Sequence, residues 1–290
     1  MENNVNDNSI ITNTEGKKEL TAYDRVHLAR DTKRPKVIDF ITALFDEFVE
    51  LKGDRLGKED NAILGGIALF HNIPVTVIGH RKGKTLEENM ACNFGMPGPE
   101  GYRKALRLMK QAEKFGRPII TFVDTPGAYP GIKAEENGQA IAIADSIAKM
   151  STLKVPVITV ITGEGSSGGA LAISVANSII MLENAVYSIL SPEGFASILW
   201  KDSSKSAKAC DLMKITARDL KNYELIDEIV SEPEGGMQAN PFEVYDELDK
   251  ILCKELKKYG KMTSDAIAKS RYHKFRKMDS IHGMVRKEAR

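Results

Sequence analysis

Along the first third of the chain, the spacing of apolar residues changes from helical to strand-like. Between residues 36 and 51, "KVIDFITALFDEFVEL" has apolar residues every three or four positions and acidic residues on the other face. That period predicts an amphipathic helix. Two β-rich runs follow, "ILGGIALF" at 63–70 and "VTVIGH" at 75–80, separated by the turn sequence "HNIP". This arrangement predicts a β-hairpin.

From residue 99 onward, strand-like runs alternate with helical ones. The expected helices span 99–116, 135–150, 168–179 and 191–200, and the expected strands span 118–124, 155–162, 178–183 and 185–190. The first of these helices begins at Pro99 and ends at Gly116, which is the usual placement of these two residues. Further helix is expected before Pro35 and beyond Pro241. The alternation predicts an α/β core with helical flanks.

Composition and charge exclude several classes of protein. The chain has 290 residues, with 41 Lys and Arg against 40 Asp and Glu, so its overall charge indicates no polyanionic partner. Its three cysteines form neither a disulfide framework nor a C-x-x-C zinc pair. No apolar run is long enough to span a membrane, and the Asn-rich start lacks the apolar core of a signal peptide. We therefore expect a cytoplasmic protein.

Three regions are expected along the chain. Residues 1–19 are polar and predicted to be disordered. Residues 20–240 form the main domain, and residues 241–290 form a helical extension with a basic tail. The tail has eight Lys or Arg against two acidic residues over 266–290, and we expect it to be solvated.

Two glycine-rich segments each follow a predicted buried strand. They are "DTPGAYPG" at 124–131 and "GEGSSGG" at 163–169, and the second runs directly into a predicted helix. Free backbone N–H groups at a strand–loop–helix junction can stabilise an oxyanion. The alternative is that the glycines only permit close packing of helix on strand. Two such segments after successive strands favour the oxyanion site.

The second segment also fits the G-x-S-x-G pattern of serine hydrolases, with Ser167 in the nucleophile position. A serine nucleophile needs a base, and the five histidines are His27, His71, His80, His273 and His282. The last two lie in the basic tail, and none shows the spacing of a metal-binding pair. We therefore predict no metal site in this chain, discount Ser167 as a nucleophile, and keep the hydrolase as the alternative function.

Several motifs together closely resemble the carboxyltransferase α-subunit family of bacterial acetyl-CoA carboxylase. They are "NFGMPGPEGYRKALRLM", "DTPGAYPG", "GEGSSGGALAI" and "SPEGFASILWK", within a likeness that covers roughly residues 20–240. The resemblance implies a crotonase-like fold, a spiral of ββα units shared distantly with Clp-type proteases. It also implies transfer of a carboxyl group from carboxybiotin to acetyl-CoA, giving malonyl-CoA for fatty acid synthesis.

The resemblance further implies site residues and partners. Gly168 and Gly169 would donate backbone N–H groups to the ureido oxygen of biotin, supported by Gly127 and Ala128. Gly165, Ser166 and Ser167 would help to bind the substrate. Biotin would be carried on a separate biotin carboxyl carrier protein and loaded by biotin carboxylase. A β subunit with a zinc ribbon would supply the acetyl-CoA side of an α₂β₂ assembly.

Overall fold

The computed structural model describes the backbone of residues 19–288 and the side chains of residues 19–278. The predicted disordered segment, residues 1–19, lies outside the described residues except for Glu19, which accepts a hydrogen bond from Arg218 at 2.9 Å. None of the described helices is both long and apolar enough to cross a bilayer.

The centre of the fold is a mixed sheet with the strand order β1-β2-β3-β4-β5-β6-β8, in which β7 pairs with β5 off this path. The strands are β1 (Asp46–Glu50), β2 (Ile63–Phe70), β3 (Ile73–His80), β4 (Ile119–Thr125), β5 (Val157–Ser166), β6 (Ser178–Leu182), β7 (Val186–Ser188) and β8 (Glu228–Val230). β1, β2 and β3 are antiparallel, whereas β3 to β6 and β8 run parallel. The predicted hairpin is therefore confirmed as β2 and β3.

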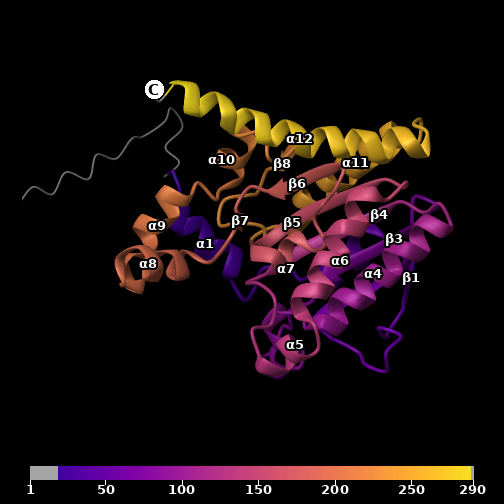
Figure 1. Ribbon diagram of the computed structural model, residues 1–290, viewed down its shortest axis with the longest axis horizontal. Coiled ribbons are helices and arrows are strands. Elements are labelled where there is room, and N and C mark those ends of the chain that lie inside the picture. The colour runs from indigo at the N-terminus through magenta and orange to yellow at the C-terminus, as the bar shows by residue number, and fades with distance from the viewer. Residues whose placement is uncertain (1–18, 289–290) are drawn as a thin grey trace, which may run out of the picture.

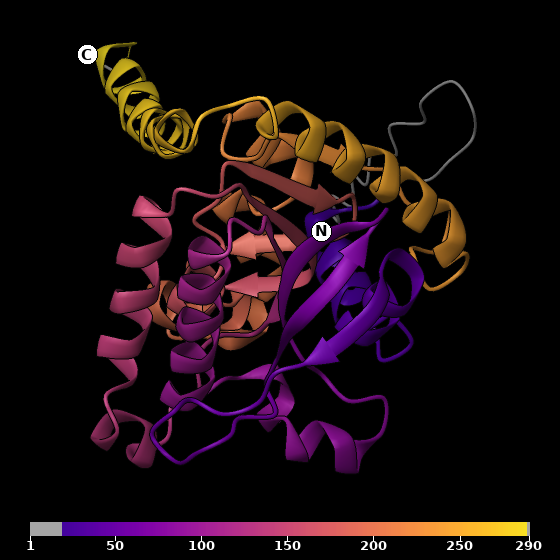
Figure 2. The same ribbon diagram turned by 90° about the vertical axis from the view of Figure 1, so that its right-hand side faces the viewer.

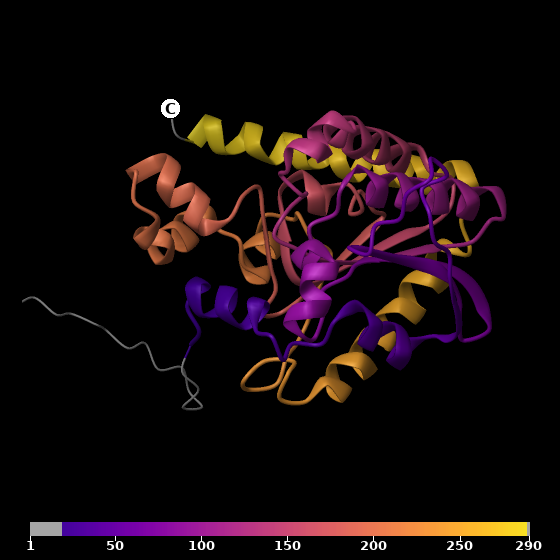
Figure 3. The same cartoon turned by 90° about the horizontal axis from the view of Figure 1, so that it is seen from below.

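Helices cover both faces of this sheet (Figure 1). They are α1 (Ala22–Arg30), α2 (Val37–Leu44), α3 (Leu86–Ala91), α4 (Pro99–Lys114), α5 (Ile132–Glu136), α6 (Gln139–Thr152), α7 (Ser167–Leu171), α8 (Pro192–Trp200), α9 (Ser206–Met213), α10 (Ala217–Asn222), α11 (Pro241–Tyr259) and α12 (Ser264–Glu288). Figure 2 shows α4 and α6 side by side on one face. Figure 3 shows α2 and α11 on the opposite face.

The core lies against β4 and β5, which are buried along their whole length. Parallel strands covered on both faces require continuous apolar sequence, as these strands have. On one side, the ring of Phe40 in α2 packs 5.4 Å from that of Phe122 in β4. On the other side, α4 buries an apolar stripe that includes Leu108 and Met109. α11 contributes residues to the same hydrophobic cluster, and the domain boundary at residue 240 stays a prediction.

The predicted helix over 36–51 is wrong in its second half. α2 ends at Leu44, and Asp46–Glu50 form the edge strand β1 against β2. Of the two apolar residues that continue the helical spacing into this strand, Phe48 packs against the core, whereas Val49 is 59% exposed. Pairing with the backbone of β2 thus overrides the local helical period.

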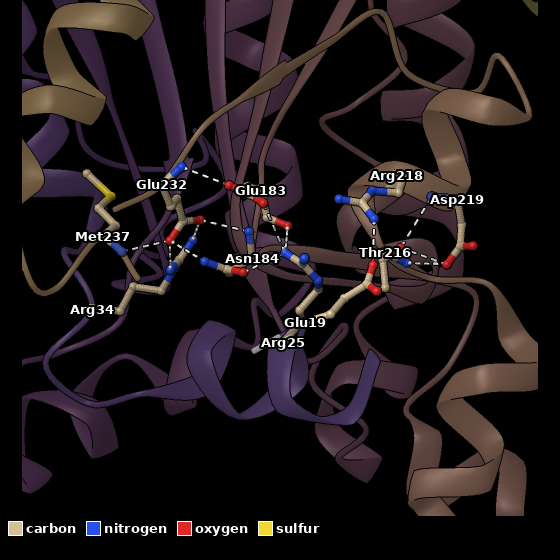
Figure 4. A network of polar contacts seen from close by, with 10 residues as sticks. All are labelled: Glu19, Arg25, Arg34, Glu183, Asn184, Thr216, Arg218, Asp219, Glu232 and Met237. Atoms are coloured by element: carbon tan, nitrogen blue, oxygen red, sulfur yellow. Dashed lines mark hydrogen bonds and ion pairs between the residues drawn. The ribbon is translucent and has the colours of Figure 1, made fainter. Parts of the chain in front are cut away.

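A buried ion pair joins the segment after α1 to the segment after β8 (Figure 4). The guanidinium of Arg34 donates to both carboxylate oxygens of Glu232, at 2.9 and 2.7 Å. Asn184 and the backbone N–H of Met237 also donate to Glu232. Burial alone would raise the pKa of Glu232, but these donors, Arg34 first, lower it overall. α1 is thereby attached to the parallel end of the sheet.

The expectation of a solvated basic tail is also wrong at one position of the described part of α12, Arg271, although most of the other basic residues described there are exposed. Arg271 is completely buried. Its guanidinium donates to the carbonyl oxygens of Met150, Leu153 and Val155 at 2.7–3.0 Å, and to the side chain of Asn177. These carbonyls lie at the end of α6 and in the loop before β5. Arg271 therefore satisfies backbone groups that an apolar side chain would leave unpaired.

We expect Arg271→Met to lower the free energy of unfolding by about 2–4 kcal/mol, because several buried acceptors lose their donor at once. The matched control is Arg276→Met, at an exposed position of the same helix, which should change it by less than about 0.5 kcal/mol. Denaturant unfolding of both variants measures the difference. Equal stabilities would show that Arg271 does not hold α12 in place.

Candidate functional site

The two glycine-rich segments meet at the carboxyl ends of β4 and β5. These strands are adjacent and parallel, so the segments that follow them share one edge of the sheet. The contact is very close: a Cβ atom built on Gly169 would lie 2.5 Å from the backbone nitrogen of Ala128 and 2.7 Å from the carbonyl carbon of Gly127. Only a hydrogen atom fits between the segments.

Much of the second segment is strand rather than the predicted loop. β5 continues through Ser166 and pairs with β7 at its end. Gly165 and Ser166 are both buried there, and Gly165 lacks a Cβ because the Tyr187 ring would meet it at 2.9 Å. These buried positions leave Ser167 and Gly168 as the members of the segment that face open space.

The helix that follows is shorter than expected. The sequence predicts a helix over 168–179, but α7 ends at Leu171, after five residues. Ser166 stands at its N-cap without a side-chain cap hydrogen bond. The first N–H groups of a helix have no intrahelical acceptor, so those of Gly168 and Gly169 are left without a partner inside α7. A helix of five residues has a small macrodipole, so any stabilisation of an anion here would come mainly from the individual N–H groups.

The first segment is held rigidly around Ala128. Thr125 Oγ1 accepts a hydrogen bond from the backbone N–H of Gly127 at 3.0 Å and donates to its carbonyl at 2.7 Å. Gly127 has a φ of +143°, which a residue with a side chain rarely adopts. On the other side, the N–H of Tyr129 donates to Pro97. The Gly127 N–H is thus already paired, and the backbone nitrogen of Ala128 is the atom of this segment nearest to Gly169.

An apolar cavity of about 600 Å³ opens beside Ser167 and Gly168. Its walls include residues of α7, the segment after β7, α8, α10 and α12, among them Leu171, Ile189, Phe195, Leu220 and Phe275. The start of α7 therefore lies at the edge of a largely apolar space, and apolar cavities with a few polar groups are typical of small-molecule sites.

Residues 3–279 match the model of a family described as acetyl co-enzyme A carboxylase carboxyltransferase-like. A carboxyl transferase subunit alpha of acetyl-coenzyme A carboxylase from Clostridium perfringens is 53% identical over 259 residues, 89% of this chain and 96% of that protein. The chain belongs to the family of acetyl-CoA carboxylase carboxyltransferase α subunits. The Geobacillus kaustophilus protein of the same name is 53% identical and covers 90% of this chain and 81% of that protein.

Solved structures of low sequence identity share the fold of this family member. Transcarboxylase 12S aligns with a TM-score of 0.65 at 18% identity, over 82% of this chain and 44% of that one. A malonate decarboxylase hetero-dimer from Pseudomonas aligns with a TM-score of 0.60 at 16% identity, over 80% of this chain and 92% of that one. The predicted crotonase-like carboxyltransferase fold is confirmed. As a family member, the chain is the carboxyltransferase component of acetyl-CoA carboxylase that forms malonyl-CoA.

Within this family member, Ser167 has the backbone but not the partners of a serine nucleophile. It is exposed and has a φ of +61°, as at a sharp strand-to-helix turn. No hydrogen bond joins it to any of the four histidines whose side chains are described; the side chain of His282 lies outside them. His80, in β3, is completely buried, and burial lowers its pKa to about 4. No described group is placed to take a proton from Ser167.

Two buried neutral groups lie behind the glycine pair, and sequence reasoning gave neither a role there. The Tyr102 hydroxyl lies 2.8 Å from the position of a Cβ on Gly169, and burial raises its pKa well above the usual value. This hydroxyl has no hydrogen-bond partner among the described residues. The His80 ring lies near the backbone of Gly169 and Phe122, which partly opposes the lowering of its pKa by burial. Tyr102 is also one of the residues that form the buried face of α4.

A second feature missed from the sequence is a buried ion pair between Lys82 and Asp124, 2.6 Å apart. Asp124 also accepts a hydrogen bond from the backbone of Glu164 at 3.1 Å. Burial would raise the pKa of Asp124, but Lys82 lowers it overall. The signal was present in the sequence, since Asp124 opens the "DTPGAYPG" segment at the end of a buried strand. The ion pair links the segment after β3 to the end of β4, and the hydrogen bond from Glu164 links the end of β4 to β5.

The two adjacent glycines should respond differently to an added methyl group. Gly169→Ala forces Cβ against backbone atoms 2.5–2.7 Å away, so we expect a loss of about 2 kcal/mol or more in stability. Gly168→Ala meets nothing closer than the Ile143 side chain at 3.6 Å, so we expect stability no lower than that of the parent. Thermal unfolding of the two variants tests this. A stable Gly169→Ala variant would contradict the close approach.

Proposed function

We propose that this chain provides the biotin-binding half of the carboxyltransferase site. The observation that carries the proposal is the uncapped start of α7, which lies against the Gly127–Ala128 segment beside the apolar cavity. In this proposal, the backbone N–H groups of Gly168 and Gly169 bind the ureido oxygen of biotin, and Ala128 assists. Ser167 lies at the rim, while Gly165 and Ser166 act only by fixing the backbone.

The residues present fit the chemistry of biotin. When bound, carboxybiotin supplies the carboxyl group, and negative charge gathers on its ureido oxygen as that group departs. The apolar cavity suits the uncharged ring system, and the backbone donors suit its single strong acceptor. Donors fixed by packing need no reorganisation when charge develops, and removing one typically costs roughly 10²–10³ in rate. No side chain of this chain needs to act as a base.

We further propose the partners that the family resemblance implies. They are a β subunit with a zinc ribbon that binds acetyl-CoA in an α₂β₂ assembly, the biotin carboxyl carrier protein, and biotin carboxylase, which loads that carrier. The name "subunit alpha" of the relatives supports a multi-subunit enzyme. Large exposed apolar side chains near the cavity, Ile189 at 79% and Ile198 at 68% exposure, also favour a protein partner over this region.

Gly168→Val should reduce malonyl-CoA formation by roughly a hundredfold or more, because the branched side chain displaces the ureido oxygen from its donors. Ser167→Ala, the matched control on the neighbouring residue, should retain most of the activity. Both are assayed with the β subunit and carboxylated carrier, after thermal unfolding has shown that each variant is folded.

Two results would contradict the assignment. A folded Gly168→Val variant with the parental rate would exclude these donors. A thousandfold loss in folded Ser167→Ala, or labelling of Ser167 by a serine-reactive probe, would favour the alternative hydrolase.

The chain without partners should not form malonyl-CoA, because the acetyl-CoA side of the site is expected on another subunit. The measurement compares the purified chain with the chain plus candidate β subunit, using the same carboxylated carrier and acetyl-CoA. Activity should appear only in the mixture. Full activity of the single chain would contradict the divided site.

A further inference from the structure

Three side chains with different metal-binding atoms converge at the turn between β2 and β3. They are His71, in the turn, and Asp249 and Cys253, on α11. The Nε2 atom of His71 lies 2.8 Å from Oδ1 of Asp249, and the Sγ atom of Cys253 lies 4.0 Å from Oδ2 of the same carboxylate. One ligand atom from each of the three residues lies within 4.8 Å of the others.

The backbone holds these side chains in place. Asp249 and Cys253 are four residues apart on α11, so they lie one above the other on the same helix face. His71 occupies a two-residue hairpin turn in which it and Asn72 have φ values of +46° and +64°. Its ring packs edge-on against the ring of buried Phe70, with centroids 4.7 Å apart. The cluster therefore joins two rigid elements rather than two mobile loops.

The donor set is that of a zinc site. Imidazole nitrogen, carboxylate oxygen and thiolate sulfur bind Zn²⁺ at about 2.0–2.3 Å, and three protein ligands leave a fourth position for water. Tetrahedral ligands at those distances are about 3.3–3.8 Å apart, so small side-chain rotations would close the cluster on one ion. The sequence gave no sign of it, because His71 is 178 residues away from Asp249.

We propose that His71, Asp249 and Cys253 bind a thiophilic divalent cation of the zinc class. The ion fastens the β2–β3 turn to α11. The turn lies at the opposite end of β3 from His80, and hence far from the glycine pair. The role is therefore one of stability rather than chemistry. An ion that binds only the folded chain raises its unfolding temperature through linkage.

The test uses the untagged full-length chain freed of metal, with Co²⁺ as the probe and Zn²⁺ as competitor. We expect one Co²⁺ per chain with a thiolate-to-cobalt charge-transfer band, loss of that band on adding Zn²⁺, and a higher unfolding temperature with Zn²⁺. Cys253→Ser should abolish the band and, like His71→Gln, weaken binding by at least about tenfold. Neither variant should unfold earlier than the metal-free parent by more than a few degrees.

The matched control is His273→Gln, which removes an exposed histidine on α12 outside the cluster and should leave band and affinity unchanged. Absence of the charge-transfer band in the parent would overturn the proposal. So would a band that survives Cys253→Ser, or parental affinity in His71→Gln. In those cases the cluster is only a histidine–aspartate hydrogen bond beside a cysteine. None of these readouts depends on carboxyl transfer.

Discussion

The site depends on one steric constraint: the start of α7 and the segment after β4 approach so closely that no side chain fits between them. The approach follows from the parallel pairing of β4 with β5, which continues to Thr125 opposite Gly165. Glycine at 169 is therefore required by packing. At Gly168 there is room for a side chain, but in the proposed site that side chain would stand in front of the N–H donors. Glycine is thus favoured at the two adjacent positions for two different physical reasons.

The electrostatic surroundings of the proposed donors follow from the same packing. Charged groups near the ends of β4 and β5 are paired, Asp124 with Lys82 and Glu164 with Arg30. The groups directly behind the glycine pair, His80 and Tyr102, are neutral because burial opposes their charged forms. No unpaired buried charge among these groups competes for the N–H donors. In a low-dielectric environment, a fixed N–H group interacts more strongly with a developing anion than it would in water.

Local patterns were sufficient for elements whose burial is set by their own sequence. The β2–β3 hairpin, the helix from Pro99 and the buried run of β4 are of this kind. Local patterns gave wrong predictions where contacts with residues distant in the sequence determine the structure. The segment 46–50 is a strand because it pairs with β2. Arg271 is buried because it donates hydrogen bonds to three carbonyl groups more than a hundred residues earlier in the chain. The local spacing of apolar residues contains no information about such contacts.

The glycine-rich segment at 163–169 is a second example of structure that local sequence patterns do not predict. Its glycines were expected to form an oxyanion site, with close packing of helix on strand as the alternative, and the approach of the segment after β4 at position 169 does require glycine. Their sequence could not show that β5 continues through Gly165, because that depends on pairing with β7, which comes twenty residues later. Burial of Gly165 and Ser166 follows from that pairing and not from their own composition.

The likeness to a serine hydrolase elbow has a geometric explanation. At Ser167 the chain turns from β5 directly into α7, and the positive φ at this residue makes so sharp a turn possible. A left-handed conformation at a residue with a side chain costs about 1–2 kcal/mol, which the surrounding sheet and helix packing must offset. In a hydrolase this turn exposes the side chain. Here it also begins α7, whose first N–H groups have no intrahelical acceptor, so the same backbone suits the proposed chemistry, in which the serine hydroxyl takes no part.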